Sequence, residues 1–392
     1  LSVTATSDND AFAASDVVSI GLFAGGGANA SAEVTSSADT DAIIGSGSQI
    51  TIQGAAVSVA AVSDNRAIAD SGTAGGGAVS VQVSSPSAKV FGDTSAKLLG
   101  SVGTTVAGVD IEGNPTTFGV AGASSVTVSA LAKDLSDASI ESTGAGIIAA
   151  SSSTATAHTQ TDVEAEFGSG NITASGNVTL LADGQTDAKA FADSLGGGAI
   201  QVAGLTTNAT MDSSVGATVG AGYIEAGNDL SIRALHDGGE ILANATGLGI
   251  GAVSINSGSA TAKANPNVDT VIDATIMRGR DVTVEALSIA RANGVSSHQA
   301  FAGINIGNTN ARVNSDNHVL TDLGSGVIIA TRDVKVFATG LTDTRVSAET
   351  DGSFGFVTDA VAVANMDLDY DVQVISDTTI DAERTVLVES RA

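Results

Sequence analysis

The chain has 392 residues, with 47 Gly, 3 Pro and no Cys or Trp, and 43% of it is hydrophobic although only 3% is aromatic. An apolar fraction made mostly of Ala, Val and Ile suits sheets that pack closely over a thin interior, rather than a thick globular core. The formal net charge of −27 argues against nucleic acid as a ligand and against an anionic membrane surface, because both require clustered Lys and Arg.

A short V-T-V-like motif returns along the whole chain and divides it into repeats. Taking its first apolar residue as an anchor, the intervals between anchors are 56, 69, 52, 52, 52, 52 and 52 residues. Five equal spacings predict an array of seven units in one elongated domain, 1–392. The units are 1–56, 57–125, 126–177, 178–229, 230–281, 282–333 and 334–385, and 386–392 begins the next; the anchors are Leu1, Val57, Val126, Val178, Leu230, Val282, Val334 and Val386.

Within each unit the elements keep their phase. A strand follows the anchor, glycines come about 18 to 21 residues later, and small alternating residues follow. A short strand and a corner, such as 276–281, then lead into the next anchor. Apolar residues alternate with period two and β-branched residues are common, which predicts strands rather than helices. Strands that recur in phase stack in register, so we expect an all-β fold, a β-solenoid of mainly parallel strands. One wide coil and two unlike coils per 52 residues fit the pattern equally.

Unit two carries 17 residues more than the usual 52, which we place at about 91–118. Long loops on a β-helix build the binding groove of polysaccharide-cleaving enzymes, which need several carboxylates and basic residues. The insertion offers Lys97, Asp110 and Glu112. A carbohydrate-binding or carbohydrate-cleaving β-helix with its site at this insertion is therefore the alternative function, although these three residues are few for catalysis.

Two charged columns precede the anchors in the later units. Strands stacked about 4.8 Å apart would bring identical acidic side chains together, and neighbouring Arg side chains would relieve the repulsion. We interpret the columns as a structural ladder at a corner rather than as a rail for a ligand. Its members are Asp229, Asp281, Asp333, Arg280, Arg332 and Arg384.

The clearest metal candidate is the segment DLDYD, with Asp367, Asp369 and Asp371. Alternate residues of a strand lie about 6.6 Å apart, too far to share one Ca²⁺ at 2.3–2.6 Å, so a solvated acidic face with at most weakly bound Ca²⁺ is expected. His158, His236, His298 and His318 stand at different phases of the repeat and form no common column. We therefore expect no catalytic residue, no bound cofactor and no enzymatic activity.

The run G-x-x-I-x-A-x-x-D-V-T-V, seen in AGYIEAGNDLSIRA and ATIMRGRDVTVEA, resembles the repeat region of giant bacterial surface adhesins, the filamentous-haemagglutinin-like and leukotoxin-like filamentous proteins. The likeness covers almost the whole chain. It implies a parallel β-solenoid stalk that is exported and folds outside the cell. The absence of cysteine fits such an exported bacterial surface protein.

The leading hypothesis is a non-enzymatic structural segment of an extracellular, cell-surface fibre or adhesin stalk. Because Leu1 and Val386 occupy the same phase, we expect the partners to be further repeats of the same chain or copies of it, joined end to end. Host-surface or matrix glycans are a second class of expected partner. No stretch approaches the ~20 apolar residues that span a bilayer, so no membrane insertion is expected.

Overall fold

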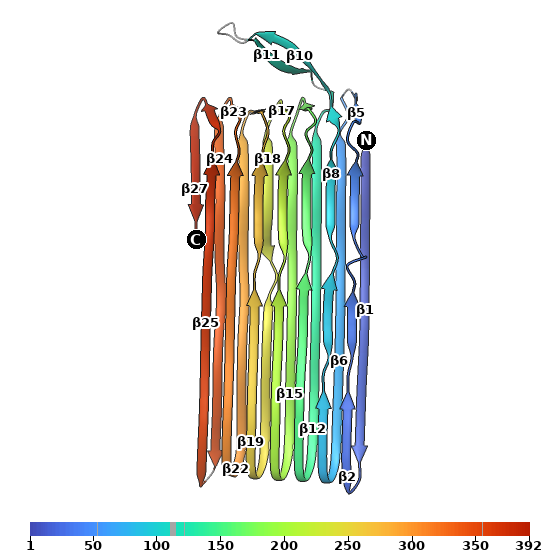
Figure 1. Ribbon diagram of the computed structural model, residues 1–392, viewed down its shortest axis with the longest axis vertical. Helices are drawn as coiled ribbons and strands as arrows, with labels where there is room; N and C mark the ends of the chain where they lie inside the picture. Colours follow the sequence, from blue (N-terminus) through green and yellow to red (C-terminus); the bar gives the residue numbers. More distant parts are fainter. Residues whose placement is uncertain (53, 110–114, 121, 355) are drawn as a thin grey trace.

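The computed structural model describes residues 1–52, 54–109, 115–120, 122–354 and 356–392. These residues form a flat slab of long, nearly parallel strands with no helix (Figure 1). The expected all-β solenoid is confirmed, and each 52-residue unit makes one wide coil rather than two. None of the described segments is a helix long and apolar enough to cross a membrane.

Each coil runs down one side of the slab and back along the other. The outgoing segment starts at the anchor, the chain turns at the glycines, and a return segment leads to a short strand that closes the coil (Figure 1). Outgoing and return segments share one 18-stranded sheet, because several strands continue through the turn. The strands that hold the outgoing segments are β1 (Ser2–Ile20), β6 (Val57–Ser84), β12 (Val126–Gln160), β15 (Val178–Met211), β18 (Leu230–Gly238), β19 (Ile241–Ala264), β22 (Val282–Leu323), β24 (Asp333–Phe354) and β27 (Thr385–Arg391).

The return side adds shorter strands, and a separate seven-stranded sheet forms the closing edge. The return strands are β2 (Phe23–Ala28), β3 (Ser31–Val34), β4 (Thr40–Ile44), β7 (Ser87–Phe91), β8 (Thr94–Leu98), β13 (Asp162–Phe167), β16 (Ser214–Val219), β20 (Asn267–Ile272) and β25 (Val357–Ser376). The closing strands are β5 (Gln49–Ile50), β9 (Ser101–Val102), β14 (Ile172–Ala174), β17 (Tyr223–Ala226), β21 (Ile276–Gly279), β23 (Val327–Ala330) and β26 (Thr379–Ala382).

The strands of successive coils are parallel and in register with the repeat. Val126 pairs with Val57 and Val178, Val178 pairs with Leu230, and the same column continues to Val386. The pairing along β12 and β15 extends over 33 registered positions without a shift, except that Ile147 and Ala199 at the turn are skipped. A one-residue slip would turn every inward side chain outward, so this column fixes the register of the whole coil.

The turn between outgoing and return segments depends on glycine. A Cβ atom at Gly198 would lie 2.1 Å from the carbonyl oxygen of Gly146, and one at Gly146 would lie 2.4 Å from that of Gly77. Because real Cβ atoms do not approach oxygen so closely, the backbones of stacked turns can meet at hydrogen-bonding distance only if glycine stands there. The glycine motif is thus a packing requirement of the turn.

The interior consists of apolar layers with polar layers between them. One apolar cluster lies near the closing edge and includes Val126, Leu180 and Phe167; a second lies mid-slab and consists mostly of alanine. Between and beyond them, buried Ser, Thr, Asn and Gln side chains face one another across the thin interior. Ser136 Oγ, for example, lies 2.9 Å from Thr159 Oγ1 on the return segment of the same coil.

The extra residues of unit two form an antiparallel hairpin at the closing edge, β10 (Thr104–Val109) with β11 (Pro115–Val120), which projects from the slab (Figure 1). Leu98 still pairs with Phe167, and Val102 with Ile172, whereas Ala123 already bridges Ala174. The pairing therefore corrects the expected position of the insertion, 91–118: residues 94–98 still belong to the ladder, and the extra residues lie between Val102 and Ala123.

Deleting residues 104–122 should leave the solenoid folded. The deletion joins Gly103 directly to Ala123, so that Val102-Gly103-Ala123 stacks on the equivalent segment of the next coil, Ile172-Thr173-Ala174. A projecting hairpin adds nothing to the shared core. We expect an unchanged β-type circular dichroism spectrum and a change of less than about 1 kcal/mol in the free energy of unfolding. Loss of cooperative urea unfolding would show that the hairpin is part of the core.

Candidate functional site

The charged corner brings together all six residues that the sequence assigned to a ladder. Arg280 donates from Nε and Nη2 to the carboxylate of Asp229 one coil earlier, at 3.1 and 3.0 Å. Arg332 Nη1 lies 3.4 Å from Asp281 Oδ2, and Arg384 Nε lies 3.7 Å from Asp333 Oδ1. Each Arg thus reaches back to the acid of the preceding coil.

The acids of this corner also contact the backbone of the next coil. Asp281 Oδ1 accepts a hydrogen bond from the backbone N–H of Asp333 at 3.3 Å, and Asn177 Oδ1 accepts one from that of Asp229 at the same distance. A short side chain with an acceptor oxygen is what this contact requires, and Asn and Asp both provide it. The arginine side chains are 43 to 59% exposed. The geometry is that of a structural corner, with its charges paired to each other.

The three aspartates proposed as a weak calcium site lie on β25 in the last coil. Asp371 Oδ2 is 3.3 Å from Nδ1 of His318, and Asp371 Oδ1 accepts a hydrogen bond from Gln373 at 2.5 Å. Asp369 Oδ1 accepts one from the backbone N–H of Tyr370. Among the described residues no group of three or more His, Cys, Asp or Glu side chains is arranged to hold a metal ion.

The four histidines occupy four unrelated places. His158 packs edge-on against Phe91 and lies 3.5 Å from Asp212, and His318 pairs with acids. His236 and His298 are buried, and burial lowers the pKa of each to about 4. His236 Nε2 lies 2.8 Å from Thr186 Oγ1, whereas His298 occupies space left free by Gly247 of the preceding coil. These neutral rings are core side chains.

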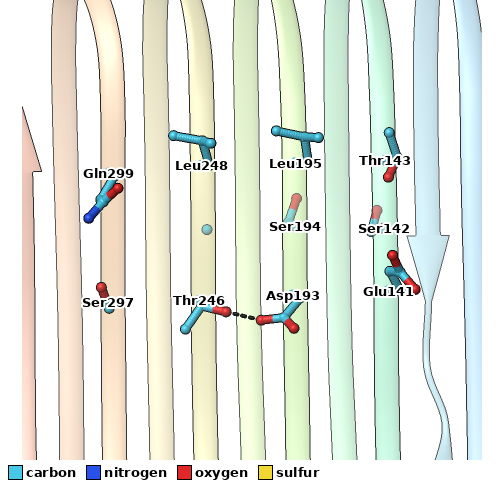
Figure 2. Close-up of a pocket in the computed structure, with 11 residues that line it drawn as sticks. Glu141, Ser142, Thr143, Asp193, Ser194, Leu195, Thr246, Leu248, Ser297 and Gln299 are labelled. Atoms are coloured by element: carbon cyan, nitrogen blue, oxygen red, sulfur yellow. Dashed lines mark hydrogen bonds between the residues drawn. The ribbon is translucent and has the colours of Figure 1, made fainter.

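An open groove of about 490 Å³ crosses four outgoing segments on the outer face (Figure 2). One wall carries Glu141, Asp193 and Thr246, and the other carries Leu195 and Leu248. Thr246 donates a hydrogen bond to Asp193, and burial together with the charge of Glu141 raises the pKa of Asp193. No Lys, Arg or His lines the groove, so it offers an acidic and an apolar wall without a nucleophile paired to a base.

Inside the slab, an amide ladder ends on a buried carboxyl group. Asn9 Nδ2 donates to Asn65 Oδ1 at 2.8 Å, and Asn65 Nδ2 donates to Asp134 Oδ1 at 2.8 Å. Asp134 is 3% exposed, and burial raises its pKa to about 7 despite the hydrogen bond from Asn65. Sequence reasoning missed this residue; the only signal was its place in a column whose two earlier members are asparagine.

Of the three residues proposed for a carbohydrate site, only Lys97 is among the described residues. Lys97 Nζ lies 2.5 Å from Glu164 Oε2 and 3.5 Å from Glu166 Oε2, on the return segment of the next coil. Asp110 and Glu112 lie outside the described residues. Comparison of the chain with protein-family models, curated proteins and solved structures finds no match.

Replacing Arg332 by Ala should lower the free energy of unfolding by no more than about 1 kcal/mol, because its ion pair with Asp281 is partly exposed to solvent. The loss should shrink in high salt, which screens exposed charges. Arg332→Lys, which keeps the charge, is the control. A salt-independent loss of several kcal/mol in urea titrations would instead assign Arg332 a buried packing role.

Asp134 should make the stability fall as the pH rises. The folded chain holds the Asp134 proton up to about pH 7, whereas the unfolded chain releases it near pH 4, so folding is penalised increasingly between these values. Asp134→Asn extends the asparagine ladder and removes the penalty. The free energy of unfolding of Asp134→Asn, measured by urea titration, should rise relative to that of the wild type by about 3 kcal/mol from pH 5 to pH 8.

The matched control for this change is Asp64→Asn, which removes one charge at an exposed position next to Asn65. It should leave most of the pH dependence in place. Equal pH profiles for Asp134→Asn and Asp64→Asn would contradict the buried-carboxyl interpretation.

Proposed function

We propose that the chain is a non-enzymatic structural segment of an extracellular bacterial surface fibre or adhesin stalk, extended by coils of the same pattern at its ends. Those coils belong either to a longer repeat chain or to further copies of this one. The proposal rests on the open core of the last coil.

The last coil leaves interior positions uncovered. Met366 and Leu368 of β25 are 45% and 38% exposed, whereas their partners in the preceding coil, Val313 and Ser315, are 0% and 3% exposed. The same columns are therefore core in one coil and surface in the next. Exposed apolar interior positions beside unpaired strand edges favour the addition of another strand layer.

The first coil is open in the same way. β1 pairs with β6 along its whole length, from Ser2 with Ser58 to Ile20 with Gly76, and no described strand covers its other edge. Its side chains alternate between exposed and half-buried positions, whereas those of β6 alternate over most of its length between buried positions and half-buried or exposed ones. Both edges therefore present the same type of ladder, and the contact between them is heterologous, which propagates instead of closing.

The charge of the chain supports a soluble fibre. With 43 acidic and 16 basic residues, neighbouring fibres carry the same strong negative charge, and this repulsion keeps them apart. The charges of the corner ladder pair with each other between coils, and His236 and His298 are packed in the core. These polar side chains therefore contribute to the stacking of coils rather than to catalysis. The adhesin-like repeat pattern supports an extracellular habitat, with host or matrix glycans as the class of partner for an adhesive surface elsewhere on such a fibre.

The assembly test compares two lysine substitutions, one in the last complete coil and one in the strand that follows it. Leu368 is 38% exposed and occupies an interior column, so Leu368→Lys should abolish concentration-dependent end-to-end association. Leu387 is 39% exposed but pairs with Lys335 of the preceding coil, whose outward column already accepts lysine. Leu387→Lys should therefore associate like the wild type.

Association is measured by sedimentation velocity over a range of concentrations and by negative-stain electron microscopy. We expect growing linear particles for the wild type and Leu387→Lys, and single slabs for Leu368→Lys. Wild-type protein that stays monodisperse at every concentration, or equal behaviour of the two variants, would contradict the proposal.

A further inference from the structure

The two end coils carry more negative charge than any coil between them. Unit 1–56 holds six acidic residues and no Lys or Arg, and unit 334–385 holds ten acidic and three basic residues. The five units between them together hold 26 acidic and 12 basic residues. The ends of the array, where a further coil stacks, are therefore its most acidic parts.

Three columns of outward side chains begin with a carboxylate in the first coil and end with one in the last coil. The strand pairing between successive coils places the first and last residue of each column at the same phase of the repeat. All six side chains are exposed. The first and last residues of the three columns are Asp10 and Asp343, Asp16 and Glu349, and Glu33 and Asp367.

Within the chain, the first of these columns sets its terminal acids beside bases. Asp10 is in register with Arg66, and Asp343 is in register with Arg291. A second copy stacked in phase on the last coil adds an acid on the free side instead, because its Asp10 follows Asp343 in the column. Neighbouring strands lie about 4.8 Å apart, and like charges directly opposite each other are destabilising. The other two columns bring acid against acid in the same way.

The final strand does not change this pairing. β27 covers only residues 333–339 of the last coil. Residues 1–7 of a stacked copy have the phase of β27, so one of these two short segments leaves its place where two copies meet. The three acidic pairs lie beyond that segment, and they form whichever of the two segments moves.

We propose that repulsion between these acidic pairs limits the end-to-end stacking of copies, so that screening or reversing the charges promotes growth. The inference rests on the proposed function, because it concerns the same contact between the last coil of one copy and the first coil of the next. Apolar interior columns favour this contact, and the three outward acidic columns oppose it. The neighbour that fits either end best is a coil with Lys or Arg in these columns.

A cycle of two substitutions at the pair of Asp16 and Glu349 tests the inference. Asp16 is in register with Gly72. Glu349 is in register with Ser297, so neither acid has a charged neighbour on its paired strand. Each single change, Asp16→Lys or Glu349→Lys, replaces a repulsive contact by an ion pair and should lower the dissociation constant of end-to-end association at least about threefold. The double variant sets lysine against lysine and should associate more weakly than either single variant.

Net charge alone cannot produce this pattern, because the double variant has lost the most negative charge and would then associate most strongly. Asp351→Lys is the matched control. It changes the charge of the last coil by the same amount, but its column begins at the uncharged Val18. It should change the dissociation constant less than about twofold, since its nearest acid at the contact is a diagonal neighbour. The gains of the single variants should disappear in about 1 M NaCl, where the Debye length is about 3 Å.

Association is measured by sedimentation velocity over a range of concentrations in about 0.1 M NaCl, and folding of each variant by circular dichroism. Equal dissociation constants for the wild type and both single variants would overturn the inference and leave the stacking of copies intact. A double variant that associates more strongly than either single variant would also overturn it, in favour of a general charge effect. Absence of association for every variant at every salt concentration would contradict the proposed stacking of copies, and this inference with it.

Discussion

The parallel, in-register backbone ladder between coils is the constraint on which the other features depend. Each column of the slab places residues 52 or 53 positions apart side by side in β12, β15 and β19, so each residue must fit the place that its partner occupies on the neighbouring strand. Where the backbone must turn tightly, the column is glycine; where a corner leaves an N–H to satisfy, it is Asp or Asn. Extra residues are accommodated only outside the ladder, as in the hairpin β10–β11.

The ladder also explains how so thin an interior can hold buried polar groups. Stacked copies of one side chain can bond to each other, as Asn9, Asn65 and Asp134 do. A polar layer of this kind is satisfied only in one register, so it adds specificity where alanine packing alone would tolerate a slip. An ionisable side chain in such a column loses its hydration when it is buried. This happens at the carboxyl group of Asp134, which follows two asparagines, and at the His298 ring, and burial keeps both groups neutral near pH 6.

The fold could be predicted from the sequence because the repeat is exact over five intervals and alternates with period two. The two charged columns of the corner could be identified for the same reason, since Asp229 and Arg280 belong to series that recur at fixed phase, whereas the pairing of each Arg with the acid of the preceding coil comes from the structure. One coil could not be told from two, because outgoing and return segments alternate alike and the glycine turn leaves no break in the pattern. Nor does alternation reveal which face is inside when the inner residues include Gln201 and Asn256.

Amide hydrogen exchange followed as a function of concentration tests most directly whether the core is open at its ends. In dilute protein, the backbone amides of β15 should be protected from exchange at both edges of the strand, because both are paired. In β1 only the amides that bond to β6 should be protected, and in β25 only those that bond to β22. As concentration rises, protection of β1 and β25 should approach that of β15. Terminal strands fully protected in dilute monomers, or exchange that never slows at any concentration, would contradict a solenoid that grows by stacking.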